Sequence, residues 1–295
     1  MRTYLDCYPC FLRQALEASR MNGADEQAQW RVLRQVLPIL ETADFAATPP
    51  EIAHRVHQTV RDILQVEDPY RLCKEESTRQ ALELYEYLRS MVDGAPDPLE
   101  ASVRLAIAGN AIDYGAPNSR PATTAALREA AKVALQLPLT IDHLGHLRDR
   151  LASSERVLYL ADNAGETVFD RVLIETMARP TTYVVKDAPI LNDAVMADAL
   201  DAGLDRVARV MSSGSNAPGT ILALCSPEMR TEFDAATLIV AKGQANFETL
   251  SDVDREVFFL LQVKCPVIGQ HLGVPVGSRI VKCTTCRSGS AYGVP

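Results

Sequence analysis

The sequence predicts an α/β fold with a Rossmann-like, mostly parallel sheet flanked by helices, and with an all-helical subdomain at its N-terminus. From residue 10 to about residue 150 the apolar residues recur every three or four positions, which is the period of packed helices. After residue 154, short apolar runs rich in β-branched residues alternate with helical stretches, as in repeated β-α units. We therefore expect a helical subdomain over residues 1–150 and an α/β domain over residues 151–295.

The individual elements are placed by their boundary residues. Pro, Gly, Asn and Asp punctuate the helical half, where we expect helices and no strand. The expected helices span 10–21, 25–40, 50–64, 70–91, 98–108, 122–135 and 143–151. Four runs that are apolar throughout suit strands of a parallel sheet covered on both faces. These expected strands span 156–161, 182–185, 206–211 and 237–241.

Composition excludes several classes of protein. Hydrophobic residues make up 47% and charged residues 23%, which is ordinary for a globular protein able to bury a core. The formal net charge of −8 is spread along the chain without a basic stripe, so nucleic acid is not an expected partner. The first 20 residues carry charges and no long apolar run, so we expect a cytoplasmic protein that does not bind a membrane. Composition leaves the oligomeric state open.

Polar residues follow the predicted strands at their carboxyl ends, where ligands bind in open α/β sheets. Asp162 and Asn163 follow the first strand, and Asp193 comes shortly after the second. Each side chain is also a good helix N-cap, which is the commoner role for any single site. Four successive polar strand ends exceed what capping requires, however. Carboxylate and amide oxygens suit a hard cation better than zinc, so we expect these three residues to bind Mg²⁺ or Mn²⁺.

The third and fourth strand ends are expected to hold an anion. Ser213, Gly214 and Ser215 precede a predicted helix with Pro218 in its first turn, an arrangement that would point backbone N–H groups at a phosphate. The segment lacks the lysine of a nucleotide-triphosphatase loop. Lys242 lies between a buried strand and a glycine, unlike a surface lysine, and is expected to supply positive charge.

A further candidate lies in the helical half. Asn110 and Asp113 follow Gly109 and interrupt an apolar helix. Alone, this pattern is typical of a helix C-cap. Together with the polar strand ends, it predicts side chains that reach over the pocket and bind substrate hydroxyls.

The sequence resembles the damage-control phosphatase family, formerly a domain of unknown function, and in particular its archaeal and bacterial branch. The resemblance spans nearly the whole chain and rests on motifs that occur in order: Cys7–Cys10 with Gln14, Asp68–Tyr70, Ala108–Asn110 with Asp113, Asp162–Glu166 with Asp170, Asn192–Asp193, Ser213–Gly214, Lys242–Gln244, Asn246–Glu248 and Lys264–Val267.

The resemblance implies a divalent cation on Asp162, Asn163 and Asp193, with Mn²⁺ or Mg²⁺ expected first and Ni²⁺ or Co²⁺ as further options. It implies that phosphate is held near Ser213–Gly214 and by Lys242. Family substrates are phosphometabolites, often sugar phosphates or damaged phosphate esters. The expected substrate-binding residues are Asn110, Asp113, Glu166, Ser213, Gly214, Ser215 and Asn246.

These expectations describe a metal-dependent phosphatase that hydrolyses a small phosphorylated metabolite by attack of water, with Asp162, Asn163, Asp193 and Lys242 as catalytic residues. Asn163 and Ala164 follow Asp162, so the nucleophile motif of haloacid dehalogenases is absent. Whether a covalent intermediate forms stays open. One alternative is an S-adenosylmethionine-dependent protein carboxyl methyltransferase, an activity described for one eukaryotic branch. Another is a sugar-phosphate-binding protein without enzymatic activity. The physiological substrate and the preferred metal are not fixed.

The seven cysteines include one CxxC pair near each end of the chain. Cys7 and Cys10 could join Cys283 and Cys286 in a structural zinc site. A disulfide within either pair, or free buried thiols, are the alternatives.

The remaining cysteines, Cys73, Cys225 and Cys265, are expected in the core. The tail from residue 282 onward is expected to be poorly ordered unless its cysteines anchor it. His143 and His146 are expected on an exposed helix and not as ligands.

Overall fold

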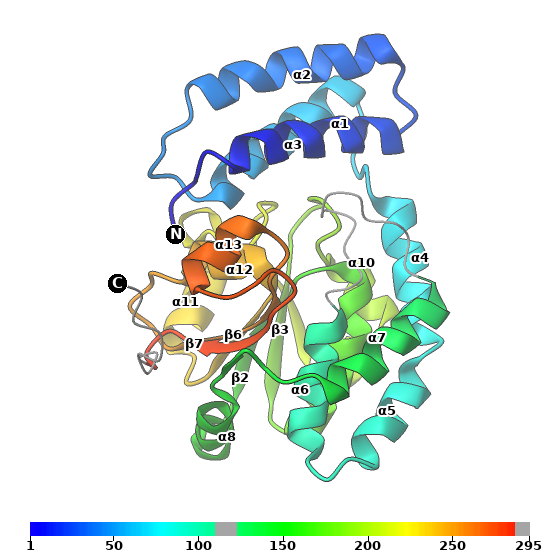
Figure 1. Cartoon of the computed structure of the whole chain (residues 1–295), viewed down its shortest axis with the longest axis vertical. Helices are drawn as coiled ribbons and strands as arrows, with labels where there is room; N and C mark the ends of the chain where they lie inside the picture. Colours follow the sequence, from blue (N-terminus) through cyan, green and yellow to red (C-terminus); the bar gives the residue numbers. More distant parts are fainter. Residues whose placement is uncertain (110–122, 287–295) are drawn as a thin grey trace.

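A seven-stranded sheet forms the centre of the computed structural model, which describes residues 1–109 and 123–286 (Figure 1). The strand order is β1-β7-β6-β5-β2-β3-β4. Strands β4, β3, β2, β5 and β6 are parallel, whereas β7 runs antiparallel to β6 and β1 runs parallel to β7. The strands are β1 Ile141–Asp142, β2 Val157–Leu160, β3 Thr181–Val185, β4 Arg209–Ser212, β5 Ile239–Lys242, β6 Val257–Gln262 and β7 Arg279–Cys283. The predicted α/β fold with a mostly parallel sheet is confirmed.

Three strands are additions to the prediction. The four predicted strands correspond to β2–β5, whereas β1, β6 and β7 were not predicted. The expectation that the first half is all helix is wrong at β1, a two-residue strand held by its pairing with β7. The tail was expected to be poorly ordered unless its cysteines anchor it, and its first two residues, Lys282 and Cys283, are ordered because both pair with β6 as part of β7.

The helices follow the predicted order, with one break. The expected helix 70–91 is two helices, α4 Arg71–Leu82 and α5 Tyr85–Asp93. Side-chain caps fix several starts, as where Asp25 accepts a hydrogen bond from the Ala28 N–H at 2.7 Å. The other helices are α1 Cys7–Met21, α2 Glu26–Glu41, α3 Pro49–Leu64, α6 Pro98–Ala108, α7 Thr124–Gln136, α8 Leu144–Ser153, α9 Thr167–Met177, α10 Met196–Asp201, α11 Pro227–Ala235, α12 Gly243–Leu250 and α13 Pro266–Leu272. The described ranges also contain the short 3₁₀ turns η2 Ala164–Glu166, η3 Leu204–Arg206 and η4 Leu222–Leu224.

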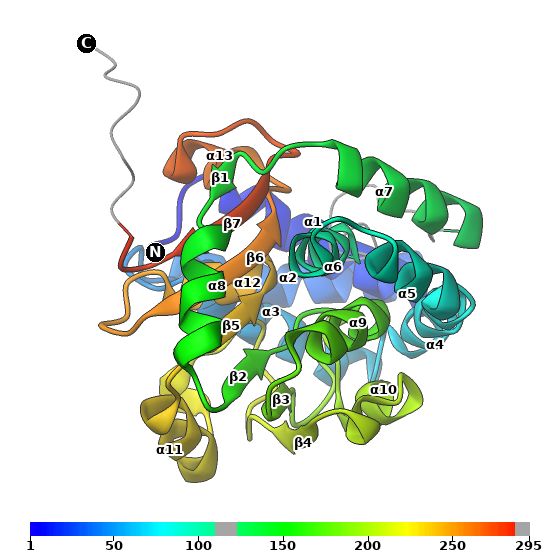
Figure 2. The ribbon, with the colours of Figure 1, turned by 90° about the horizontal axis from the view of Figure 1, so that it is seen from below.

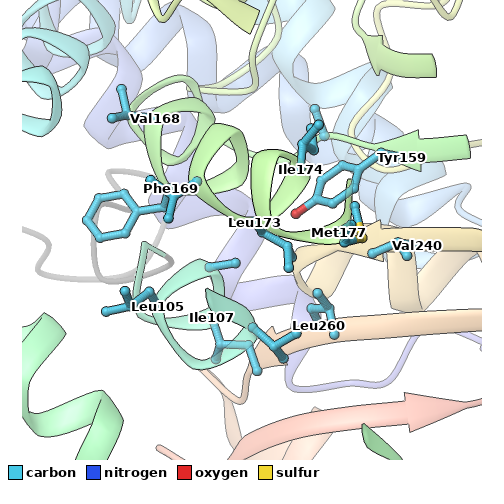
Figure 3. Close-up of a cluster of buried hydrophobic side chains, with 14 of the residues drawn as sticks. Leu105, Ile107, Tyr159, Val168, Phe169, Leu173, Ile174, Met177, Val240 and Leu260 are labelled. Atoms are coloured by element: carbon cyan, nitrogen blue, oxygen red, sulfur yellow. The ribbon is translucent and has the colours of Figure 1, made fainter. Parts of the chain in front are cut away.

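Helices α1–α3 form a unit with its own apolar core, and this unit lies above the sheet at the end opposite α8 (Figures 1 and 2). Helices α4–α9 share the main core with the sheet instead. Figure 3 shows this core where α6 and α9 meet Tyr159, Val240 and Leu260 of three neighbouring strands. The main core thus includes residues on both sides of residue 150, and the division into domains 1–150 and 151–295 stays a prediction.

The strand order places a topological switch point beside β2. From β2 the chain adds β3 and β4 on one side of the sheet, and it then crosses to add β5 and β6 on the other. The connections that leave β2 and β5 therefore lead to helices that pack in different cores, α9 and α12, and open α/β sheets bind ligands at the carboxyl ends of such strands. Within the two described ranges, no helix is long and apolar enough to cross a lipid bilayer.

Candidate active site

A cavity of about 350 Å³ lies between the α1–α3 unit and the carboxyl ends of the parallel strands. Its walls come from α1, the start of α3, the loops after β2 and β3, α12, and the segment that leads from β6 into α13. It therefore occupies the crevice that the strand order predicts. A cavity of this volume has room for a small metabolite.

The three predicted metal ligands line this cavity together. Asp162, Asn163 and Asp193 are each at most 7% exposed and come from the loops after β2 and β3. The two loops are joined by their backbones: the Ala194 N–H donates to the Asp162 carbonyl at 2.8 Å, and an isolated bridge pairs Asn163 with Asp193. The side chains are thus held near one another by main-chain hydrogen bonds.

A glycine allows the loop after β5 to reach the same place. Gly243 has a φ of +78°, and a Cβ atom at this position would lie 1.8 Å from Oδ2 of Asp162. Any other residue would be strained and would displace the Asp162 carboxylate. The close approach of the two loops at the switch point therefore depends on Gly243.

The side chain of Asn163 is oriented by two neighbouring carboxylates. Its Nδ2 atom donates to Oδ2 of Asp162 at 3.2 Å and to Oε1 of Glu166 at 2.6 Å. The amide nitrogen is committed to these bonds, so the side-chain oxygen is the atom suited to a cation. Two carboxylates and one amide oxygen make a hard donor set that fits Mg²⁺, Mn²⁺ or a similar ion.

Lys242 does not line the cavity, contrary to its predicted contact with phosphate. Its side chain is fully buried, and Nζ lies 2.8 Å from both Oε2 of Glu166 and Oδ1 of Asp170. Burial by itself lowers the pKa of Lys242, but the Asp170 and Glu166 carboxylates outweigh it and hold this pKa above its ordinary value. The ammonium group is therefore part of a buried ionic network, and so is Glu166, which was expected at the substrate.

Two tyrosines complete this network. The Tyr159 hydroxyl donates to Oδ1 of Asp170 at 2.7 Å, and the Tyr183 hydroxyl donates to Oδ2 at 2.8 Å. Both tyrosines are fully buried, and burial followed by the charge of Asp170 raises the pKa of each well above its ordinary value. They therefore stay protonated and act as hydrogen-bond donors.

The serine-rich loop after β4 differs from the predicted phosphate cradle. The backbone N–H groups of Gly214, Ser215 and Ala217 donate to serine hydroxyls of the same loop at 2.9, 3.2 and 3.2 Å. No helix starts at Pro218; the next described helical turn is η4, which begins at Leu222. The amides expected to bind an anion are thus used within the loop. Pro218 is the residue of this loop that does line the cavity.

Asn246 also has a role different from the predicted one. Its Nδ2 atom donates to the carbonyls of Ala161 at 3.0 Å and Lys242 at 2.8 Å, and its Oδ1 accepts from the Thr220 hydroxyl at 2.7 Å. It does not line the cavity. Asn246 therefore joins the ends of β2 and β5 to the loop after β4 and does not face a substrate. Asn110 and Asp113, the remaining predicted substrate-binding residues, lie outside the described residues.

The positive charge near the cavity comes from residues to which the sequence assigned no role. Arg13 and Lys264 line the cavity, and Nζ of Lys186 lies 3.5 Å from Oδ2 of Asp193. Lys186 also donates to the Gly219 carbonyl. The sequence did offer a signal for two of these residues. Arg13 stands directly before Gln14, and Lys264 begins the motif Lys264–Val267, and both Gln14 and that motif carry the family resemblance.

The two CxxC pairs lie at opposite edges of the sheet. Cys7 and Cys10 line the cavity together with Cys265, whereas Cys283 ends β7 opposite Phe258 at the start of β6. A single zinc site on all four terminal thiols is therefore not formed. All seven cysteines are described, and all are free thiols.

Burial raises the pKa of four titratable groups in the cavity wall, Cys7, Cys10, Cys265 and Glu248. Burial is the main cause that raises the pKa of Cys7 to about 11, so its thiol is protonated near neutral pH. Burial likewise raises the pKa of Glu248 to about 7. The Gln244 amide donates to Glu248 at 2.9 Å and partly offsets that shift.

Comparison with known proteins places this geometry in a family. The model of the damage-control phosphatase ARMT1-like domain matches residues 3–280. A damage-control phosphatase of Archaeoglobus fulgidus is 33% identical over 94% of this chain and 97% of that protein. One of Pyrococcus horikoshii is 32% identical over 95% of this chain and 97% of that protein. The crystal structure of a DUF89 family protein from Pyrococcus horikoshii superimposes with a TM-score of 0.87 at 30% identity, covering 95% of this chain and 98% of the other. The chain belongs to the damage-control phosphatase ARMT1-like family.

Proposed function

We propose that this protein is a metal-dependent phosphatase that hydrolyses small phosphate monoesters, such as sugar phosphates or damaged phosphometabolites. The observation that carries the proposal is the convergence of Asp162, Asn163 and Asp193 on one cavity at the switch point of the sheet. The two relatives that are named damage-control phosphatases, which match nearly the whole chain, support the same reaction class.

In this proposal the two carboxylates and the Asn163 oxygen would hold a hard divalent cation. When bound, such a cation polarises a phosphoryl oxygen and lowers the pKa of a water molecule. The protein supplies the orientation of the donors through the backbone bonds between the two loops. It also keeps the Asn163 oxygen turned away from the Glu166 side, since the amide nitrogen is hydrogen-bonded there.

Cationic side chains would bind the anionic part of the substrate. Arg13, in the middle of α1, and Lys264, just after β6, lie in the cavity wall, whereas the buried Lys242 does not. An arginine can bind a phosphate through two parallel hydrogen bonds, and a lysine contributes a point charge. Residues of α1 and α3 form one wall of the cavity, opposite the carboxyl ends of the parallel strands.

The test is phosphate release from a panel of phosphorylated metabolites, each assayed with Mg²⁺, Mn²⁺, Ni²⁺ and Co²⁺. We expect turnover only with a divalent cation, and we expect Asp193→Asn to lower kcat/KM by about 100-fold or more, since it removes one charged ligand. Asp205→Asn, an exposed acid on η3, is the matched control and should leave turnover unchanged.

Two results would replace the proposal. Binding of phosphate esters without phosphate release would assign the protein to a ligand-binding role. Transfer of a methyl group from S-adenosylmethionine to a protein carboxylate, with no phosphate release under any metal, would assign it to the methyltransferase activity.

A further inference from the structure

A second cluster of metal-binding side chains lies far from the cavity. The ligand atoms of His146, Cys283 and Cys286 all lie within 4.8 Å of one another. His146 is in the first turn of α8, and the two cysteines are at the end of β7 and just after it. Among the described residues, no other three His, Cys, Asp or Glu side chains bring their ligand atoms this close together.

A carboxylate stands next to the cluster. Oε1 of Glu256 lies 2.9 Å from Nε2 of His146 and accepts a hydrogen bond from Thr285 Oγ1 at 3.1 Å. Arg150 binds the other carboxylate oxygen. Ligand atoms around a tetrahedral zinc ion are about 3.3–3.8 Å apart, so the atoms of His146, Cys283 and Cys286, now within 4.8 Å of one another, need to move by only about 1 Å.

The backbone around the cluster is held in place. The Cys283 N–H donates to Nδ1 of His143 at 3.0 Å, and Thr284 pairs with Val257 through hydrogen bonds in both directions. The ring of His146 packs on Phe258 with centroids 5.3 Å apart. The site is therefore built by α8, the start of β6 and the end of β7 on a rigid edge of the sheet.

We propose that His146, Cys283 and Cys286, with Glu256 as the fourth group, bind a structural zinc ion. Two thiolates and an imidazole select zinc over Mg²⁺ or Mn²⁺, and the CxxC spacing is typical of structural zinc sites. The site replaces the predicted one on all four terminal cysteines, because a histidine and a carboxylate take the place of the distant Cys7 and Cys10.

The site would join α8 and the end of β7 to the sheet at the edge opposite the cavity. The six residues of β6 separate the two edges, which corresponds to roughly 20 Å. Figures 1 and 2 show α8 at this edge, beyond the strands from the α1–α3 unit. The zinc ion would stabilise the fold without touching the substrate.

The experiment measures zinc in the full chain purified without chelators, by plasma mass spectrometry. We expect about one zinc ion per chain in the wild type and its loss in Cys286→Ser and His146→Ala. Cys73→Ser, a half-buried cysteine on α4, is the matched control and should keep the metal. Phosphate release per folded molecule in Cys286→Ser should stay within about twofold of wild type, while its Tm falls by several degrees.

Cobalt substitution separates this site from the cavity. Thiolate-to-cobalt charge-transfer absorption should appear in the wild type and in Asp193→Asn, and it should be absent from Cys286→Ser. Cys286→His keeps a zinc ligand and should retain the metal if the serine variant folds poorly. The proposal is overturned if the wild type takes up neither zinc nor cobalt at thiolates, or if thiol titration shows a Cys283–Cys286 disulfide. Loss of zinc from Asp193→Asn but not from Cys286→Ser would overturn it as well.

Discussion

Two groups of acidic side chains follow the carboxyl ends of β2 and β3 but have different surroundings. Asp162 and Asp193 line the cavity, whereas Glu166 and Asp170 are fully buried around the ammonium group of Lys242. Asp162 and Asp170 are eight positions apart in the sequence, on either side of η2. The difference shows that a polar residue after a strand does not necessarily reach the cavity: Glu166 and Asp170 are instead paired with the buried Lys242.

The buried group behaves as a structural element. Its two carboxylates share one lysine and two tyrosine hydroxyls, so their charges are paired inside the core. In the cavity group, the buried Lys186 lies 3.5 Å from Asp193, whereas the other nearby cations, Arg13 and Lys264, line the cavity. One group thus stabilises the fold, and we propose that the other is available for chemistry.

The largest expected effect comes from removing the buried cation. Lys242→Met should lower the free energy of unfolding by about 3–5 kcal/mol, because Glu166 and Asp170 would stay buried without their counter-ion. Urea unfolding measures this. Lys132→Met, at a half-exposed surface ion pair, is the control and should change stability by less than about 1 kcal/mol. A loss of similar size in both variants would mean that the network is not a special stabilising element.

Asp162→Asn tests the other side of the comparison. We expect kcat/KM for phosphate release to fall by about 100- to 1000-fold, or about 3–4 kcal/mol of transition-state stabilisation, with little change in unfolding free energy. Steady-state kinetics with saturating Mn²⁺, combined with urea unfolding, separates the two effects. If instead stability falls and activity per folded molecule is kept, Asp162 belongs with the structural group.

Substitution of Glu248 should change how the free energy of unfolding varies with pH, and this effect is intermediate in size. Its pKa of about 7 in the folded protein lies above the ordinary value of 4.5, so the folded protein binds this proton more tightly than the unfolded chain. The contribution to stability is therefore present below about pH 4.5, falls as the pH rises and is lost above about pH 7. Between pH 5 and pH 8 the free energy of unfolding of Glu248→Gln should rise by roughly 2 kcal/mol relative to that of wild type.

Urea unfolding at these two pH values is the measurement for Glu248. Glu155→Gln, an exposed acid before β2, is the control and should show no such difference between the two pH values. Parallel pH profiles for wild type and Glu248→Gln would show that burial in the cavity wall does not perturb this carboxyl group.

The smallest expected effect comes from the cavity wall. Arg13 is exposed to solvent and lines the cavity, so Arg13→Ala should raise KM for a phosphate ester about five- to tenfold with a smaller change in kcat. Arg31→Ala on α2, outside this cavity, should leave KM unchanged. Equal KM values for wild type and Arg13→Ala would remove Arg13 from substrate binding.

Most of the fold was predictable because the signals were local. Helical periodicity marked α1–α3, and apolar runs marked β2–β5. Strand β7 was not predicted because its stability comes from antiparallel pairing with β6. This contact joins distant segments and leaves no local pattern in the sequence. The same pairing places Cys283 away from Cys7 and Cys10, which is why the four terminal cysteines do not meet in one site.

Part of the candidate site was predictable from the rule that ligands gather at strand ends. That rule brought Asp162, Asn163 and Asp193 together. It failed for Lys242, because sequence does not show which carboxylates a buried lysine pairs with, and Asp170 lies a helical turn into the next element. It also failed for the serine loop, where hydroxyl side chains satisfy the amides expected to bind phosphate.

Equilibrium binding of Mn²⁺, followed by electron paramagnetic resonance of the free ion, tests most directly whether the cavity group holds a metal. Wild type and Asp205→Asn should bind Mn²⁺ with the same affinity, and Asp193→Asn should bind it at least about tenfold more weakly. Undiminished Mn²⁺ affinity in Asp193→Asn, in a variant that is fully folded, would contradict the assignment of these oxygen ligands and the phosphatase mechanism built on them.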